Sequence, residues 1–278
     1  MKSITLPEEL TLETNQSVQV FDYNSMQPIV KQEIILNQNA FSFLMEGTKE
    51  VFFDTSAISI DNTRFLLMGA GHCLMTEKLS DVKSYRSVLL FFTNEALLKF
   101  IHKVALDKTV SKGYKSVYDF QYDHFIQGFA KSLSDISRLS KHLQTKLLEV
   151  KFEEIMLYLT EIYGTDFLSS FIVKSPDSTQ KFIRTVETNQ LSKLTLKELA
   201  FLCNMSISTF KREFEKHYGE SPIKWFQNKR LEHAHYLLNQ QQKNSSEIYV
   251  AAGYENLSSF IQAYKSKYGM TPKQHHKK

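Results

Sequence analysis

An internal repeat constrains the fold of the C-terminal part of this sequence more than any other feature. Six residues recur 50 positions later as the same or a similar residue, so that Phe210, Phe214, Tyr218, Gly219, Ser221 and Pro222 correspond to Phe260, Tyr264, Tyr268, Gly269, Thr271 and Pro272. Upstream of each set, Glu198-Leu199 corresponds to Glu247-Ile248, now 49 residues apart, so the second copy has one additional residue between the two matched segments. A single copy would also fit a helical bundle in which these aromatic residues are only core. Two copies favour a duplicated helix-turn-helix, whose turn tolerates one insertion.

Each copy has the start and stop signals of two short helices. In the first copy, Thr195 and Ser206 are typical N-caps, and Gly219 is a typical helix end. Between the copies, Ser221-Pro222 predicts the start of a longer helix that runs to about Asn239, because Pro favours the first helical position. The pattern therefore predicts two helix-turn-helix units joined by one connecting helix.

The second helix of each unit has an aromatic face and a polar face. In the first unit, Phe210 and Phe214 lie four residues apart and should pack on the preceding helix, which leaves the opposite face free to enter a DNA groove. Arg212 and Lys211 are the best candidates for contacts to guanine acceptors. The residues that we predict to bind DNA are Ser206, Ser208, Thr209, Lys211 and Arg212 in the first unit, and Asn256, Ser258, Ile261, Gln262 and Lys265 in the second.

The charge distribution supports a polyanionic partner for this half of the chain. Residues 176–278 contain 16 Lys and Arg against 9 Asp and Glu, whereas residues 1–175 contain 18 against 21. Such an asymmetry is expected if one half meets double-stranded DNA. An unevenly charged but solvated surface is the alternative explanation.

The N-terminal part has a strand-like pattern from about residue 17 to residue 100. Segments 40–46, 49–54, 63–68 and 85–92 are aromatic and β-branched, with turn residues between them, which favours a small antiparallel barrel or sandwich. Their aromatic residues fit either a side-chain core or the lining of a ligand cavity. These are Phe41, Phe43, Phe52, Phe53, Phe65, Phe91 and Phe92.

Helical periodicity follows, most clearly over residues 141–163. An apolar stripe with alternating spacings of four and three runs along this segment through Leu148, Phe152, Ile155, Leu159 and Ile162. The stripe fits a helix that lies on the barrel and equally a dimerisation helix. We place a linker at residues 166–176, between a regulatory domain at 1–165 and a DNA-binding domain at 177–278, so the expected fold class is α+β.

Few residues suggest other chemistry. His72 is a lone histidine next to Cys73, whereas metal sites need several ligands together, so we expect no metal, no cofactor and no enzyme activity. The two cysteines are too few for a disulfide framework. The sequence has no apolar run of about 18 residues and no secretory signal at its start, so we expect a cytoplasmic protein without membrane contact.

The C-terminal half resembles the DNA-binding domain of AraC/XylS-type regulators. The resemblance rests on LTLKELAFLCNMSISTFKREFEKHYGESPIKWFQNKRLEHAHYLL and AAGYENLSSFIQAYKSKYGMTP, including Arg230-Leu231 and the Gly253-Tyr254 turn. The N-terminal half, through AFSFLMEGTKEVFF, RFLLMGAGHCLM and SVLLFF, is similar to the cupin-like domain of the same family. It is nearest to the subgroup related to type III secretion and virulence activators.

This resemblance implies a cupin-like β-barrel and a transcription regulator that activates. It implies a homodimer formed through the helix at residues 141–163, contact with RNA polymerase, and control by an unknown effector, either a small molecule or an antagonist protein. The two units should read two successive major grooves. The chain departs from the family at Tyr249, at Gln262, where a stronger donor is usual, and at Gln274-His275-His276. These departures suggest that the second unit relies more on phosphate contacts from Lys265 and Lys267.

Overall fold

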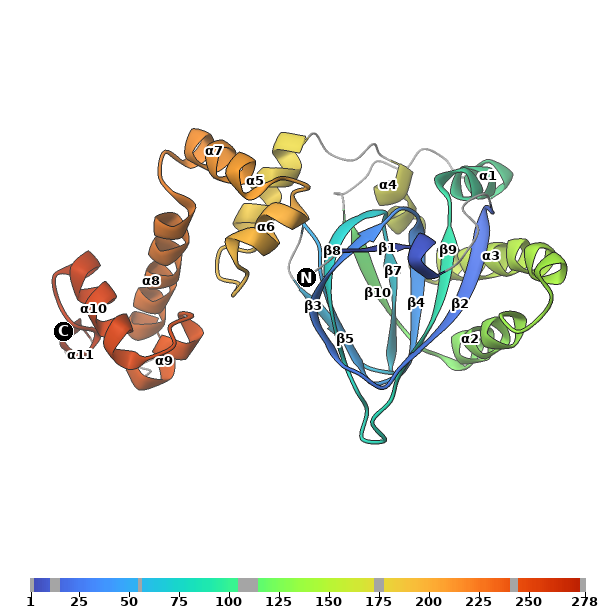
Figure 1. Cartoon of the computed structure of the whole chain (residues 1–278), viewed down its shortest axis with the longest axis horizontal. Helices are drawn as coiled ribbons and strands as arrows, with labels where there is room; N and C mark the ends of the chain where they lie inside the picture. The colour runs from blue at the N-terminus through green and yellow to red at the C-terminus, as the bar shows by residue number, and fades with distance from the viewer. Residues whose placement is uncertain are drawn as a thin grey trace. The chain divides into compact units, whose positions relative to one another are not determined.

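The chain forms two compact units, Met1–Phe182 and Ile183–Lys278. The computed structural model describes residues 3–10, 16–54, 57–104, 115–172, 178–240 and 245–275. The N-terminal unit contains two five-stranded sheets and the C-terminal unit is helical (Figure 1). The predicted α+β class is therefore confirmed.

The two sheets of the N-terminal unit are almost entirely antiparallel. The first has the order β1 (Ile4–Leu6), β3 (Ile29–Leu36), β8 (Gly71–Lys78), β5 (Thr48–Phe52) and β6 (Ile58–Ile60), with β1 and β3 parallel. The second has the order β10 (Val117–Gln121), β7 (Arg64–Met68), β4 (Asn39–Glu46), β9 (Tyr85–Phe92) and β2 (Val18–Ser25). The segments with aromatic alternation predicted as strands correspond to β4, β5, β7 and β9, whereas the sequence pattern defined β1, β2, β3, β6, β8 and β10 less well.

The second sheet is buried on both faces. On β4, Phe41 and Phe43 belong to a core formed with the helices, whereas Ala40 and Leu44 belong to the core between the two sheets. The helices that complete the outer core are α1 (Asn94–Val104), α2 (His124–Ile136), α3 (Lys141–Tyr163) and α4 (Asp166–Ile172). The N-terminal aromatic residues are thus shared between two cores, because alternate residues of a strand point to opposite faces.

Helix α3 has the predicted bounds, but its apolar stripe faces inward. Leu148, Phe152, Ile155 and Leu159 are buried in the core beneath the helix, and Phe152 lies with its ring centroid 4.8 Å from that of Phe92. Of the five predicted dimerisation residues, Ile162 alone is exposed. The two interpretations of the stripe are therefore resolved for four of these residues, which pack on the sheet of their own chain and are not available to a partner.

The segment expected as a linker is partly helical. Residues 166–172 form α4, and its Phe167 and Leu168 are buried in the N-terminal core. The Ser- and Pro-containing composition of residues 166–176 does not indicate this short helix, whose burial depends on tertiary contacts. The N-terminal unit consequently extends beyond residue 165, and residues 173–177 of the expected linker lie outside the described residues.

The C-terminal unit consists of short helices around a longer one. Its elements are α5 (Ser178–Thr188), which begins in the N-terminal unit, α6 (Leu196–Leu202), α7 (Ile207–Tyr218), α8 (Pro222–Gln240), α9 (Ser245–Ala251), α10 (Leu257–Tyr268) and α11 (Pro272–His275). Helices α6 and α7 form one helix pair, α9 and α10 the other, and α8 connects them (Figure 1). This is the arrangement that the 50-residue repeat predicts. Within the described residues, no helix is both long and apolar enough to cross a membrane.

Candidate nucleic-acid interface

An aromatic core holds helix α7 of the first helix-turn-helix unit in place. Phe210 and Phe214 are fully buried, and the Phe214 ring centroid lies 5.5 Å from that of Trp225 and 5.7 Å from that of Phe226 on α8. Leu199 and Leu202 of α6 are buried as well. One face of α7 is therefore committed to the protein interior.

The ends of α7 are capped as the sequence predicts. The Ser206 hydroxyl accepts a hydrogen bond from the Thr209 backbone N–H at 3.1 Å, and Gly219 ends the helix in the left-handed conformation with φ 69°. Thr195 forms a capping box with Glu198 at the start of α6. These caps satisfy backbone groups that a helix end leaves unpaired, and they set where α7 begins and ends.

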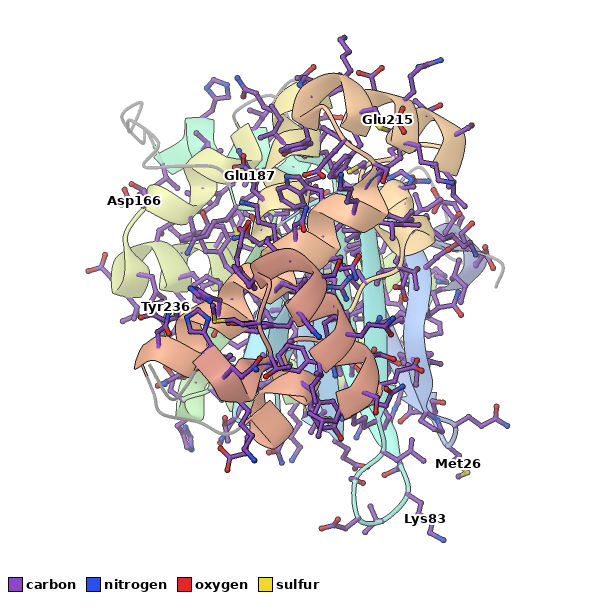
Figure 2. The ribbon with its side chains drawn as sticks, turned by 90° about the vertical axis from the view of Figure 1, so that its left-hand side faces the viewer. Met26, Lys83, Asp166, Glu187, Glu215 and Tyr236 are labelled. Carbon is purple, nitrogen blue, oxygen red and sulfur yellow. The ribbon has the colours of Figure 1, made fainter. Side chains whose placement is uncertain are left out.

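The opposite face of α7 is exposed. Ser208, Lys211 and Arg212 are all exposed, and the Arg212 side chain has 75% of its surface accessible. Arg212 lies 3.8 Å from Glu213, which is a loose surface ion pair that a DNA contact can replace at little cost. The side chains of α7, Glu215 among them, project from the helix in Figure 2.

Two of the predicted DNA contacts in the first unit also have a structural role. The hydroxyls of Ser206 and Thr209 lie 2.9 Å apart, and that of Ser206 lies equally close to Ser208. Because Ser206 caps the helix, its contact with DNA would be made from a residue already held in place. The position at the helix N-terminus also suits a phosphate group, since free backbone N–H groups point outward there.

The second unit repeats this design around α10. Phe260 and Tyr264 are fully buried, and the Tyr264 hydroxyl lies 2.8 Å from Nδ1 of His235 on α8. Asn256 caps α10 by accepting a hydrogen bond from the Ser259 backbone N–H at 2.8 Å, and Gly269 ends the helix with φ 74°. Cap, core and end of α10 therefore occupy the same repeat positions as those of α7.

The exposed face of α10 differs from that of α7 in chemistry. Ser258, Gln262 and Lys265 are exposed, whereas Ile261 is half-buried and packs against the core of the second unit. Ile261 is thus less accessible than the sequence suggested. The position of Arg212 in the first unit is taken by a neutral amide in the second, which offers weaker attraction to a polyanion.

The expected phosphate contact of Lys267 does not fit its surroundings. Its Nζ lies 3.0 Å from both Glu232 Oε1 and the Asn228 backbone oxygen, so it ties α10 to α8 instead of pointing to solvent as a phosphate ligand. The ion pair lowers the pKa of Glu232 through its hydrogen bond to Lys267. Among the basic residues of α10, Lys265 remains exposed.

A contact between Arg230 and Gly253 was not predicted as a functional feature. Gly253 has φ 76°, and the position of a β-carbon there would lie 3.1 Å from the Arg230 side chain. Arg230 Nε also donates to the Phe226 carbonyl at 3.3 Å. The glycine in this turn is therefore favoured by its left-handed backbone conformation, whereas the Arg230 side chain would have to shift only slightly to admit a β-carbon.

Among the residues that the structure describes, no three His, Cys, Asp or Glu side chains lie together as a metal site would need. Burial lowers the pKa of His72, and burial raises the pKa of the Cys73 thiol to about 12. A buried, protonated thiol is a poor nucleophile and a poor metal ligand.

Comparisons with known proteins agree with this division into two parts. Residues 199–278 match the family model described as a helix-turn-helix domain, and residues 39–171 match that of the ExsA N-terminal regulatory domain. The chain therefore combines a helix-turn-helix domain with a region similar to the ExsA N-terminal regulatory domain. The resemblance of the N-terminal half to the virulence-activator subgroup is confirmed by the second of these matches.

Two similar proteins each match somewhat less than half of the chain. Thermoregulatory protein LcrF of Yersinia pestis is 32% identical over 129 residues, which cover 46% of this chain and 48% of the relative. HTH-type transcriptional regulator ExsA of Pseudomonas aeruginosa is 29% identical over 124 residues, covering 44% of this chain and 45% of the relative. The chain spans about half the length of these relatives.

Solved structures of ToxT from Vibrio cholerae align over most of the chain at low similarity. An apo form carrying one substitution is 14% identical, covers 95% of this chain and 98% of that chain, and has a TM-score of 0.46. The wild-type form, described as bound to an unsaturated fatty acid, is 15% identical with a TM-score of 0.41 over 95% of this chain and 96% of that chain.

Proposed function

We propose that this protein is a sequence-specific transcription activator that reads two successive major grooves with α7 and α10. The observation that carries the proposal is the matched pair of helices, each capped, anchored by two buried aromatic residues and exposed on the opposite face. A helix of this kind can place its first turns against base edges. LcrF, named a thermoregulatory protein, and ExsA, named a transcriptional regulator, support the regulatory role.

The proposed base contacts centre on the first unit. Lys211 and Arg212 offer charged donors to guanine, and Ser208 offers a hydroxyl to a base or phosphate. In the second unit we retain Ser258, Gln262 and Lys265 as the DNA-facing set, with Ile261 at its half-buried edge and Asn256 as the cap. The first unit is therefore expected to specify its half of the site more sharply than the second.

The test is selection of binding sites from random duplex DNA with the full-length protein at a stated salt concentration. We expect two elements whose centres lie about 10–10.5 base pairs apart, the one read by α7 being better defined. Binding that depends on salt but not on sequence would contradict the proposal.

Arg212→Ala provides the sharper measurement. We expect the affinity for the selected site to fall by about 1–3 kcal/mol, together with relaxed preference at one base pair. Arg138→Ala is the matched control, because Arg138 is an exposed arginine in the N-terminal unit. Uniform weakening at every base would instead assign Arg212 to a phosphate.

We further propose that the protein acts as a homodimer through the outward face of α3. Three exposed apolar residues, Leu143, Val150 and Leu157, follow one another at intervals of seven along this helix and have 42%, 63% and 50% of their surface accessible. A seven-residue apolar repeat is the pattern that a partner helix covers. These residues replace the buried set in the proposed interface, whereas Ile162, five residues beyond Leu157, lies on a different face of the helix.

Sedimentation of Leu157→Glu tests this face. We expect the variant to be monomeric at concentrations where the wild type is dimeric, because a carboxylate would be buried in the interface. Val30→Glu is the control, since Val30 is also 63% exposed but lies on β3. A dimer that survives Leu157→Glu places the interface elsewhere.

The remaining parts of the proposal follow from the family. Control acts through the N-terminal unit by a small molecule or a partner protein, and activation proceeds by contact with RNA polymerase. Action on duplex DNA is also consistent with a cytoplasmic location.

A further inference from the structure

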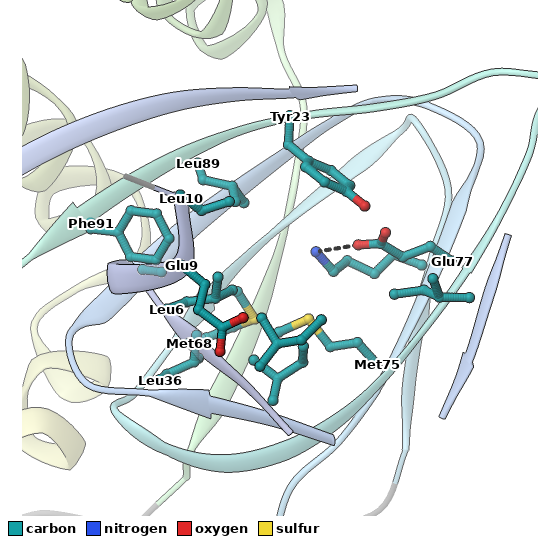
Figure 3. Close-up of a pocket in the computed structure, with 15 residues that line it drawn as sticks. Leu6, Glu9, Leu10, Tyr23, Leu36, Met68, Met75, Glu77, Leu89 and Phe91 are labelled. Atoms are coloured by element: carbon teal, nitrogen blue, oxygen red, sulfur yellow. Dashed lines mark ion pairs between the residues drawn. The ribbon is translucent and has the colours of Figure 1, made fainter. Parts of the chain in front are cut away.

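A cavity of about 240 Å³ lies between the two sheets of the N-terminal unit (Figure 3). Its wall is mostly aliphatic and comes from both sheets and from the N-terminal segment. The apolar residues that line it are Ile4, Leu6, Leu10, Ile29, Ile34, Leu36, Ala40, Met68, Met75, Leu89 and Phe91. The cavity is larger than the roughly 150 Å³ apolar cavity that accepts benzene, and smaller than most drug-sized pockets of about 300–1,000 Å³. Its volume therefore suits a short or medium hydrocarbon chain.

One part of this cavity is polar. Lys49 Nζ lies 3.3 Å from Glu77 Oε1, and the two side chains have only 3% and 6% of their surface accessible. Lys49 also donates to the Ser42 hydroxyl at 3.2 Å. The Tyr23 side chain points toward this pair in Figure 3. Glu9 also lines the cavity but is exposed to solvent. The buried polar part, Lys49 with Glu77, thus offers hydrogen-bond donors and acceptors at the edge of an aliphatic space.

A buried ion pair does not by itself make a fold more stable. Removing two charges from water costs several kcal/mol per ion, and aliphatic side chains of similar volume often serve as well or better. Both residues line a space large enough for another molecule, so their remaining hydrogen-bonding capacity can be directed into that space. Lys carries three donors and a carboxylate accepts at two oxygens, which is more than the ion pair and the bond to Ser42 use.

The charge of the pair limits the ligand's polar group. Lys49 and Glu77 neutralise each other, so an incoming carboxylate would meet the Glu77 carboxylate at short range in a medium of low dielectric. An ammonium group would meet Lys49 in the same way. A hydroxyl or amide, by contrast, can donate to Glu77 and accept from Lys49 without adding charge.

We propose that this cavity binds a neutral amphiphile whose hydroxyl or amide group contacts Lys49 and Glu77 and whose medium-length hydrocarbon chain occupies the aliphatic space. The proposal gives a chemical class to the small-molecule alternative for the effector and rests on the proposed control through the N-terminal unit. Binding is measured without DNA, so failure of this proposal is distinguishable from failure of the DNA-binding proposal.

Calorimetry of the full-length protein with 1-octanol and with octanoate tests the assignment, because the two probes share a chain length and differ in the charge of the polar group. Near neutral pH we expect 1-octanol to bind at least about tenfold more tightly than octanoate, as is typical for the loss of one hydrogen bond to a charged group. Equal or tighter binding of octanoate, or no binding of 1-octanol up to its solubility limit, would overturn the proposal.

Two variants locate the site. Glu77→Gln removes the like charge, so we expect octanoate to gain about tenfold or more in affinity while 1-octanol changes by less than about threefold. Ala40→Leu fills the aliphatic space and keeps the polar part, and we expect it to weaken 1-octanol about tenfold or more. Circular dichroism verifies that each variant is folded. Undiminished 1-octanol binding by folded Ala40→Leu would place the alcohol elsewhere and overturn the assignment.

Discussion

Removal of the Phe214 ring is expected to destabilise the first helix-turn-helix severely. The ring is fully buried, and its centroid lies 4.6 Å from that of Tyr218, 5.5 Å from Trp225, 5.7 Å from Phe226 and 5.8 Å from Phe210. Deletion of a buried phenylalanine ring typically costs about 3–5 kcal/mol, and loss of four aromatic neighbours places this site toward the upper end. We therefore expect Phe214→Ala to lower the free energy of unfolding by about 4 kcal/mol, and Phe214→Leu, which keeps most of the volume, by about 1–2 kcal/mol.

Trp225 provides the assay for this prediction. It is the only tryptophan in the sequence, and it contacts Phe214 directly, so its fluorescence during urea unfolding reports on this core. Lys216→Ala on the same helix is the control, because the Lys216 side chain is 71% exposed and its removal should change stability by no more than about 0.5 kcal/mol. A loss below about 1 kcal/mol for Phe214→Ala, or an equal loss for Lys216→Ala, would refute the assignment of Phe214 as the centre of the core.

Two further predictions concern the caps and the second unit. Ser206→Ala should lower the free energy of unfolding by about 1 kcal/mol, because the first turn of α7 loses its cap. Ser208→Ala should leave the free energy of unfolding unchanged and weaken DNA binding. Equal stability losses for the two variants in urea titrations would contradict this assignment of a capping role to Ser206 and a binding role to Ser208. Burial lowers the pKa of His235, with His275 and Lys267 contributing, while Tyr264 and Tyr268 of α10 also face its ring. The folded state therefore prefers the neutral ring, so this contribution to stability is fully present above the ordinary histidine pKa of about 6.5 and is lost as the pH falls through the lower folded-state pKa. As the pH falls below that value, the melting temperature of the wild type should drop relative to that of His235→Gln. Identical pH profiles for the two proteins would show that His235 does not titrate in this way.

Local signals account for what the sequence predicted well. The caps at Thr195 and Ser206 and the helix end at Gly219 depend on a few neighbouring residues, and the structure has all three where the pattern indicates. The repeat then transfers the same interpretation to α10. Signals of this kind are readable because backbone groups at helix ends need partners close in sequence.

Non-local packing explains what the sequence could not predict. The apolar stripe of α3 has the same periodicity whether the helix covers a sheet or a second helix, so periodicity alone could not place Leu148 and Phe152 in the core of their own chain. The partners of Lys267 lie 35 and 39 residues away on α8, and no local pattern marks that contact. The cavity is also non-local, since its polar part joins Lys49 of β5 to Glu77 of β8.

Comparison of the two repeat copies shows that inward and outward positions of α7 and α10 differ in how similar they are. Positions that make the helix fold are kept between the copies, as Phe210 with Phe260 and Gly219 with Gly269, whereas the outward positions change from Arg212 to Gln262 and from Glu215 to Lys265. Substitutions at outward positions touch neither core nor cap, so under the proposed DNA-reading role of α7 and α10 they would alter the preferred DNA sequence at little cost in stability. Under that proposal, each copy could acquire a new DNA target independently of the other, through changes to a few surface residues in one half of the helical unit.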